Sequence, residues 1–169
     1  MITEFNDSFF MARALELARQ AEREGEIPVG ALLVHFEGEI LAEAYNQPIA
    51  LNDPTAHAEI LAIRRAAERV GNYRLLNTTL YVTLEPCPMC AAAMVGGRIE
   101  RLVFGAFDPR VGAAGSVWNL LEGSILNHAV ESVGGILEAE CRELLQSFFR
   151  HRRGERCQSP VERARLEIG

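Results

Sequence analysis

The sequence predicts a single α/β domain with three layers, in which helices cover both faces of a central mixed sheet of about five strands. Two observations favour this fold class. Segments with helical periodicity alternate with short strand-like segments along most of the chain. The 169 residues, 49% of them hydrophobic and 24% charged, match one globular domain of ordinary composition, which excludes disordered and fibrous classes.

The first third of the chain predicts a helix followed by a β-hairpin. Residues 7–24 carry apolar side chains at helical spacing, and either Asn6 or Asp7 can serve as the N-cap. Residues 28–36 and 39–45 have the composition of strands and are separated by a Glu-Gly turn.

The middle of the chain predicts a second helix that begins at Pro54 and ends at Val70. Asp53 is expected to be its N-cap, proline is favoured at the first helical position, and Gly71 follows its end. The remaining elements are strands over residues 80–84, 101–105 and 130–133, helices over residues 86–95 and 136–153, and a Gly/Ala loop over residues 107–116.

These elements form one domain over residues 1–154, which includes an Arg-rich C-terminal helix. Residues 155–169 are a polar tail that we expect to be poorly ordered. The N-terminus carries acids where a signal peptide needs basic residues, and no apolar run approaches the roughly 18 residues needed to cross a membrane. Four cysteines are too few for a disulfide scaffold. We therefore expect a cytoplasmic protein without membrane contacts.

The net charge of −6 argues against a nucleic-acid partner when the chain is taken as a whole. The charge is unevenly distributed, however. Residues 1–141 have 10 Arg and 19 acids, whereas residues 142–169 have 7 Arg and 4 acids. Phe148 and Phe149 are followed within residues 150–156 by four of these Arg, a combination typical of sites that bind phosphates and unstacked bases. The alternative is a helix C-terminus enriched in Arg to complement the helix dipole.

Two short clusters carry candidate metal ligands. Cys87 and Cys90 are three residues apart at the start of a predicted helix, so both sulfurs lie on one face, and the helix N-terminus favours the thiolate. With His57 they make three ligands that suit zinc and leave a fourth position open, as in catalytic zinc sites. Glu59 is then a carboxylate near the metal that can move protons.

One tension concerns the spacing of His57 and Glu59, because residues two apart in the middle of a helix point in different directions. We expect the metal near the N-terminal end of that helix, where both side chains can approach it. Other interpretations are a redox Cys-x-x-Cys pair, or a structural zinc site completed by Cys141 and Cys157. The first does not use the His-x-Glu cluster. The second is weakened because Cys141 lies among apolar residues and Cys157 lies in the polar tail.

His-Ala-Glu at residues 57–59 followed by Pro-Cys-x-x-Cys at residues 86–90 resembles the zinc-dependent cytidine/deoxycytidylate deaminase superfamily. Over residues 5–153 the chain is similar to the bacterial tRNA adenosine deaminases of that superfamily. Blocks that carry this similarity include Val29-Gly-Ala, Tyr45-Asn, Asp53-Pro-Thr-Ala-His-Ala-Glu-Ile, Asn72-Tyr-Arg-Leu, Thr83-Leu-Glu-Pro-Cys, Phe104-Gly-Ala and Gly112-Ala-Ala-Gly-Ser.

The resemblance implies a three-layer α/β/α cytidine-deaminase-like fold, one Zn²⁺ per subunit and a homodimer. It also implies hydrolytic deamination of adenosine to inosine at wobble position 34 of a tRNA anticodon, with the arginine tRNA of anticodon ACG as substrate. By the same resemblance, Glu59 is the catalytic proton carrier and His57, Cys87 and Cys90 hold the metal. The implied substrate contacts are Asn46, Ala58 and Val29, and the implied RNA contacts are Asp108, Arg110, Phe149, Arg150, Arg152 and Arg153.

Two rival functions remain open. A deaminase of a free base or nucleotide, such as guanine, cytosine or deoxycytidylate, would share the metal site but would not need the Arg-rich last helix. A zinc-bearing RNA-binding protein without activity would not need Glu59, which only catalysis requires.

Overall fold

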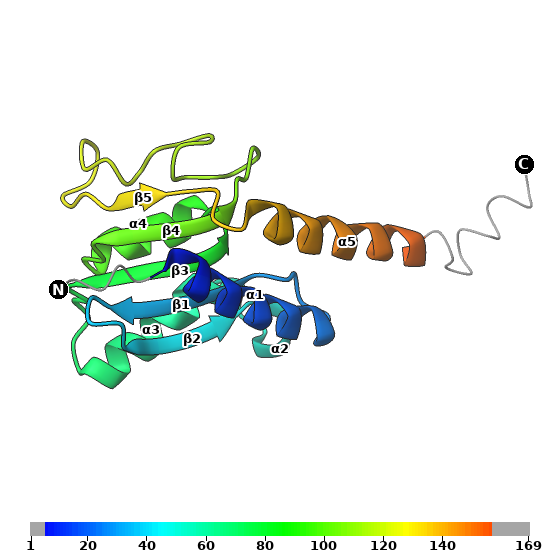
Figure 1. Cartoon of the computed structure of the whole chain (residues 1–169), viewed down its shortest axis with the longest axis horizontal. Coiled ribbons are helices and arrows are strands. Elements are labelled where there is room, and N and C mark those ends of the chain that lie inside the picture. The colour runs from blue at the N-terminus through cyan, green and yellow to red at the C-terminus, as the bar shows by residue number, and fades with distance from the viewer. Residues whose placement is uncertain (1–5, 157–169) are drawn as a thin grey trace, which may run out of the picture.

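Five short strands form one mixed sheet in the computed structural model, which describes residues 6–156, and apolar residues dominate the central strands (Figure 1). The strands are β1 (Gly30–His35), β2 (Ile40–Tyr45), β3 (Thr78–Leu84), β4 (Arg101–Ala106) and β5 (Glu131–Val133). The helices are α1 (Asp7–Arg23), α2 (Pro48–Leu51), α3 (Ala58–Val70), α4 (Pro88–Gly96) and α5 (Glu138–Arg156).

The sheet has the strand order β2-β1-β3-β4-β5. The hairpin strand β1 is antiparallel to both of its neighbours, whereas β3, β4 and β5 are parallel to one another. Helix α4 makes the crossover that a parallel β3–β4 pair requires. The N-terminus of α4 therefore lies at the carboxyl end of β3, the edge at which open α/β sheets bind ligands.

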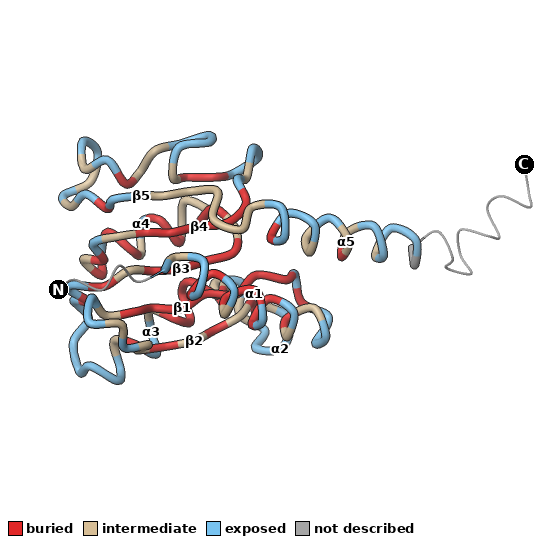
Figure 2. Tube along the Cα trace, viewed as in Figure 1, coloured by how far each residue is buried: buried red, intermediate tan, exposed pale blue. Residues whose placement is uncertain are grey.

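Alternation along the strands places successive side chains in two separate cores. The central strands are the mainly buried part of the sheet (Figure 2). Leu33 and Val82 pack on the face that α3 and α4 cover. Leu32, Tyr81 and Val103 pack on the opposite face, against α1 and the first turns of α5. Helices thus cover both faces, which confirms the predicted three-layer fold class.

A close helix–strand contact sets the position of α1. A Cβ atom at Gly30 would lie 2.1 Å from the carbonyl oxygen of Ala14 and 2.6 Å from the nitrogen of Ala18. Only glycine allows the backbones of β1 and α1 to approach this closely. The N–H of Gly30 also donates to Oγ1 of Thr83 on β3 at 3.2 Å, so the same residue joins α1, β1 and β3.

Strand β2 is one edge of the sheet, and two arginines of α3 reach its backbone carbonyl groups. Arg65 Nη1 donates to the carbonyl oxygen of Glu43 at 2.6 Å. Arg69 Nη1 donates to the carbonyl oxygens of Ile40 at 2.9 Å and Leu41 at 3.2 Å. Part of the edge is therefore bonded to side chains of the same chain.

The second helix begins four residues later than predicted, so the expectation that it starts at Pro54 is wrong. The Asp53 carboxylate accepts hydrogen bonds from the backbone N–H of Thr55 at 2.8 Å and from its hydroxyl at 2.7 Å. Asp53 thus closes a local turn instead of capping a helix. Helix α3 begins at Ala58 with His57 as its N-cap. The short helix α2, which lies just before this turn, was not predicted.

The other predicted elements are present, and their ends lie within three residues of the expected positions. Helix α5 continues to Arg156, so the first two residues of the predicted tail are helical. The expectation of poor order for the rest of the tail, including Cys157, falls on residues outside those described. Within residues 6–156, no helix combines the length and the hydropathy needed to cross a membrane.

Asp7 joins the start of α1 to the centre of the sheet. Its two carboxylate oxygens accept hydrogen bonds from the two terminal nitrogens of Arg101 at 2.8 Å each, and the Tyr81 hydroxyl donates to Oδ1 at 2.9 Å. The hydrogen bond from Arg101 lowers the pKa of Asp7 below 3.8, although partial burial opposes this effect. The folded state therefore favours the charged form of this carboxyl group.

We predict that Asp7→Asn lowers the free energy of unfolding at pH 7 by about 1–2 kcal/mol, because it removes a hydrogen-bonded ion pair. Since the pKa of Asp7 is lower in the folded state, its contribution is present above the ordinary value of 3.8 and is lost as the pH falls through the folded-state value. The difference in unfolding free energy between wild type and variant, measured by urea unfolding, should thus shrink below about pH 4. Glu16→Gln, which alters an exposed ion pair, is the control. An equal difference in unfolding free energy at pH 7 and below about pH 4 would contradict this account.

Candidate metal centre and adjoining groove

Helices α3 and α4 contact each other on one face of the sheet, and a potential metal ligand stands at the start of each. His57 is the N-cap of α3, with φ −70° and ψ 152°, and Cys87 is the N-cap of α4, with φ −73° and ψ 169°. Both are extended, so they precede the helical turns. The two-residue spacing of His57 and Glu59 therefore does not direct their side chains apart as it would in the middle of a helix, because only Glu59 lies inside the helix.

The three predicted ligands are brought together. Nδ1 of His57 lies 3.7 Å from Sγ of Cys87 and 3.5 Å from Sγ of Cys90, and the three ligand atoms lie within 4.8 Å of one another. A tetrahedral zinc ion with Zn–N of about 2.0–2.1 Å and Zn–S of about 2.3 Å separates its N and S ligands by roughly 3.6 Å. The side chains present therefore fit zinc and leave one coordination position for water or substrate.

The electrostatics of the cluster favour a thiolate. The hydrogen bond from the Cys90 thiol and the neighbouring His57 lower the pKa of Cys87 to about 4, although burial opposes this. The same contact with Cys87, together with burial, raises the pKa of Cys90. The hydrogen bond to Cys87 also raises the pKa of His57. Cys87 is thus the first of the two thiols to ionise, and the thiolate is the form that binds metals.

Glu59 lies in the first turn of α3 and is only 4% exposed. Burial raises its pKa, whereas its own backbone N–H, His57 and the Cys90 thiol act in the opposite direction. The carboxyl group stands beside the ligand cluster but is not a member of it. A buried carboxyl group at such a position is suited to accept and donate protons.

Asn46 follows β2 directly and is buried. Its Oδ1 accepts a hydrogen bond from the N–H of Ala58 at 2.8 Å, and its own N–H donates to the carbonyl oxygen of Val29 at 3.0 Å. Ala58 and Val29, which the resemblance implies as substrate contacts, therefore hold Asn46 in place through their backbone groups. Among the described residues, Nδ2 of Asn46 has no hydrogen-bond partner, so this donor is available to a ligand.

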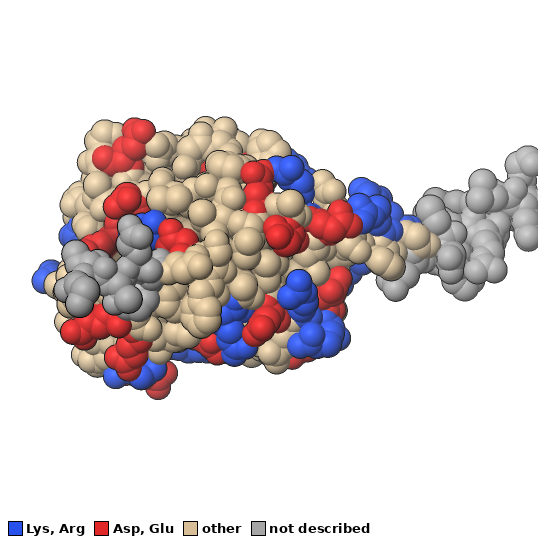
Figure 3. Space-filling model, in the orientation of Figure 1, with Lys and Arg blue, Asp and Glu red and all other residues tan. Residues whose placement is uncertain are grey.

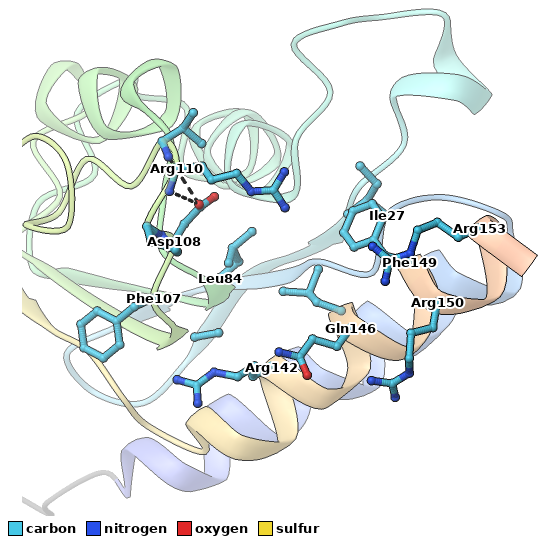
Figure 4. Close-up of a pocket in the computed structure, with 14 residues that line it drawn as sticks. Ile27, Leu84, Phe107, Asp108, Arg110, Arg142, Gln146, Phe149, Arg150 and Arg153 are labelled. Atoms are coloured by element: carbon cyan, nitrogen blue, oxygen red, sulfur yellow. Dashed lines mark hydrogen bonds between the residues drawn. The ribbon is translucent and has the colours of Figure 1, made fainter.

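A groove of about 1130 Å³ lies between the loop after β4 and helix α5. Leu84, the last residue of β3, lines it three residues before Cys87. Figure 4 shows Asp108 and Arg110 on the loop side and Phe149, with Arg150, on the α5 side. The groove therefore approaches the chain segment that carries the metal ligands.

The structure brings most of the predicted RNA contacts to this groove. Asp108, Arg110, Phe149, Arg150 and Arg153 line it. Arg152 does not, because it donates to the carbonyl oxygen of Gly25 at 2.6 Å and stacks over the Phe148 ring, 4.8 Å from the centroid. In the structure, Arg152 joins α5 to the end of α1.

Sequence reasoning missed Arg142, which also lines the groove. Helical spacing could have identified it, because residues 142, 146, 149 and 153 follow one another at intervals of three or four along one face. Arg142 and Arg150 each pair with a glutamate of α5. Figure 3 shows acidic and basic side chains intermixed over the body, with basic ones on the projecting part of α5.

Comparison with known proteins agrees with this chemistry. Residues 5–106 match the family model described as the cytidine and deoxycytidylate deaminase zinc-binding region. The chain is 50% identical to the tRNA-specific adenosine deaminase of Haemophilus influenzae, over 98% of this chain and 93% of the relative. It is 49% identical to the tRNA-specific adenosine deaminase of Bacillus subtilis, over 87% of this chain and 91% of the relative.

Solved structures also match this chain. A structure from studies of A-to-I editing by tRNA:A34 deaminases at the wobble position of transfer RNA matches with a TM-score of 0.79 and 46% identity, over 82% of this chain and 99% of the other. A structure of NE0047 with 2,6-diaminopurine matches with a TM-score of 0.76 and 24% identity, over 95% and 87% of the two chains. At that identity the second match shows a shared fold alone.

We predict that Cys87→Ala and Cys90→Ala each lose most of the bound zinc, because two remaining ligands cannot complete the site. Elemental analysis of the purified proteins measures this, with about one zinc per chain expected for wild type. Cys141→Ala is the matched control, since Cys141 is a buried thiol packed between β4 and α5 and should leave the metal content unchanged. Full zinc occupancy in either cysteine variant of the cluster would refute the ligand set.

Proposed function

The chain belongs to the cytidine and deoxycytidylate deaminase zinc-binding family and within it to the tRNA-specific adenosine deaminases, and from this membership we propose that it converts adenosine to inosine at the wobble position of a tRNA anticodon. The observation that carries the proposal is the cluster of His57, Cys87 and Cys90 beside buried Glu59, in a chain that shares half its residues with such an enzyme. The enzyme is a zinc-dependent hydrolase.

The reaction replaces the amino group at C6 of adenine with oxygen from water and releases ammonia. His57, Cys87 and Cys90 would hold the zinc ion, which would lower the pKa of water and so supply a nucleophile at neutral pH. Glu59 accepts the proton that water loses and delivers it to the departing amine. Its burial keeps bulk water from competing for this proton.

Asn46 orients the base in this proposal. Its Oδ1 already accepts a hydrogen bond from the N–H of Ala58, whereas Nδ2 has no partner among the described residues and can donate to the substrate. Adenine offers ring nitrogens as acceptors, and Nδ2 can donate to one of them. The N–H of Ala58 holds the Asn46 side chain, and the carbonyl oxygen of Val29 holds the Asn46 backbone. Both residues support the reaction in this way.

The groove beside α5 is proposed to bind the tRNA. Arg110, Arg142, Arg150 and Arg153 supply positive charge for phosphates, and Phe149 offers an aromatic face for an unstacked base. Asp108 lines the loop side of the same groove. A free base would not need a groove of this size and charge, so the groove favours RNA over a small substrate.

Three further features come from the resemblance and remain proposals. The substrate is the arginine tRNA with anticodon ACG, the active form is a homodimer, and the location is the cytoplasm. We also propose that residues 1–154 are the deaminase domain. Ile49 and Leu51, both on the short helix α2, are exposed apolar side chains that a dimer contact would bury.

We predict that the wild-type protein forms inosine in an anticodon stem-loop with sequence ACG, and that it does not release ammonia from guanine, cytidine or deoxycytidylate. Glu59→Gln should keep its zinc and lose at least about 100-fold in kcat, because its side-chain amide cannot carry the proton. Inosine is measured by digestion and chromatography, and zinc by elemental analysis. Substantial turnover in Glu59→Gln would exclude its proton-transfer role, and selective turnover of a free base would favour the rival function.

We predict that replacing Arg150 and Arg153 together by Ala weakens stem-loop binding about tenfold or more at low salt. It should also reduce the slope of log K against log salt by about 1.4, since each phosphate contact on a single strand contributes about 0.7. Fluorescence anisotropy over a salt series measures both effects. The control replaces Arg65 and Arg69 on α3, which removes the same charge at the β2 edge. Equal effects in the two double variants would show only a general charge effect.

A further inference from the structure

Glu85 is a buried carboxylate that is neither a member of the metal-ligand cluster nor a residue that lines the groove. It follows β3 and comes two residues before Cys87, yet its side chain is only 2% exposed. Burial of a carboxyl group is costly unless hydrogen bonds compensate for the lost water. Its partners therefore indicate what it does.

Glu85 accepts four hydrogen bonds, two on each oxygen. Oε1 accepts from the backbone N–H groups of Ala114 at 3.1 Å and Ser116 at 3.0 Å. Oε2 accepts from the backbone N–H of Asp108 at 2.9 Å and from the Ser116 hydroxyl at 2.5 Å. Every one of these partners belongs to residues 108–116, the loop that follows β4.

The loop is wrapped tightly around this carboxylate. A Cβ atom at Gly112 would lie 2.4 Å from both Cδ and Oε2 of Glu85. The N–H of Ala113 donates to the carbonyl oxygen of Pro86 at 2.8 Å, which adds a second contact between the loop and the segment of Cys87. The loop and the metal-ligand segment are thus joined at several points.

The same loop forms one wall of the groove. The Asp108 carboxylate accepts hydrogen bonds from the N–H of Arg110 at 2.9 Å and from that of Val111 at 3.4 Å, as Figure 4 shows. Asp108 and Arg110 both line the groove. A displacement of the Asp108 backbone would therefore move two of the groove residues together.

We propose that Glu85 is a positioning residue that holds the groove wall at a set distance from the metal ligands, so that RNA bound in the groove presents its base to the catalytic site. This rests on the proposed function of the groove. Glu85 touches neither the substrate nor the reacting atoms in this account. Its contribution is to substrate binding and not to the chemical step.

The variant Glu85→Gln gives a directional test. A glutamine has one acceptor oxygen, and placing it at the Oε1 position keeps the bonds to Ala114 and Ser116. The amide nitrogen then lies at the Oε2 position, where the Ser116 hydroxyl can turn to accept a hydrogen bond but the N–H of Asp108 loses its acceptor. Hydrogen exchange in the free protein should speed up about tenfold or more at Asp108 and change little at Ala114.

Kinetics with the anticodon stem-loop complete the test. In Glu85→Gln we expect KM to rise about tenfold while kcat stays within about threefold and zinc content is unchanged. Glu37→Gln, at an exposed glutamate of the β1–β2 turn, is the control and should match wild type. Gly112→Ala is a second variant that displaces the loop while Glu85 remains, and it should also raise KM with zinc retained.

An unchanged hydrogen-exchange rate at the Asp108 N–H in folded Glu85→Gln would overturn the proposal. An unchanged KM in both Glu85→Gln and Gly112→Ala would also overturn it. Loss of zinc together with kcat would instead make Glu85 a support of the metal site. The exchange measurement needs no substrate. If the wild type fails to deaminate the stem-loop, the proposed function fails, while exchange still decides whether Glu85 holds the loop.

Discussion

The metal centre depends on two helices that begin next to each other at the same edge of the sheet. The parallel β3–β4 crossover fixes the start of α4, and with it Cys87 and Cys90. The start of α3 is fixed from another part of the chain, because the Asn46 side chain caps the N–H of Ala58. Both helix dipoles point their positive ends at the cluster, which favours the thiolate there.

Three glutamates are buried within residues 6–156, and their hydrogen bonds differ. Glu26 accepts from the N–H groups of Ile49 and Ala50, so it holds the start of α2. Glu85 accepts four hydrogen bonds from the loop after β4. The partners of Glu59 are its own backbone N–H and the Cys90 thiol. Glu59 is the one of the three whose partners include a thiol of the ligand cluster, so its carboxyl group is the one placed for proton transfer there.

Local sequence was enough to predict the ligand cluster and every element except the short helix α2, because periodicity and ligand spacing are short-range signals. The start of α3 was mispredicted because Asp53-Pro54 has the composition of a helix cap, and only the distant Asn46 selects the later start. The direction of Arg152 depends on how α5 packs against α1. The role of Glu85 could not be predicted, since its partners lie 23 to 31 residues further along the chain.

The arginines that bond to the carbonyl groups of β2 have a consequence for assembly. An exposed edge strand is a template for pairing with a strand of another molecule. Arg65 and Arg69 occupy acceptors that such a strand would need, so the sheet resists growth across β2. A molecule that contacts this edge would then have to associate by side-chain packing, because the arginines hinder the addition of a further strand to β2.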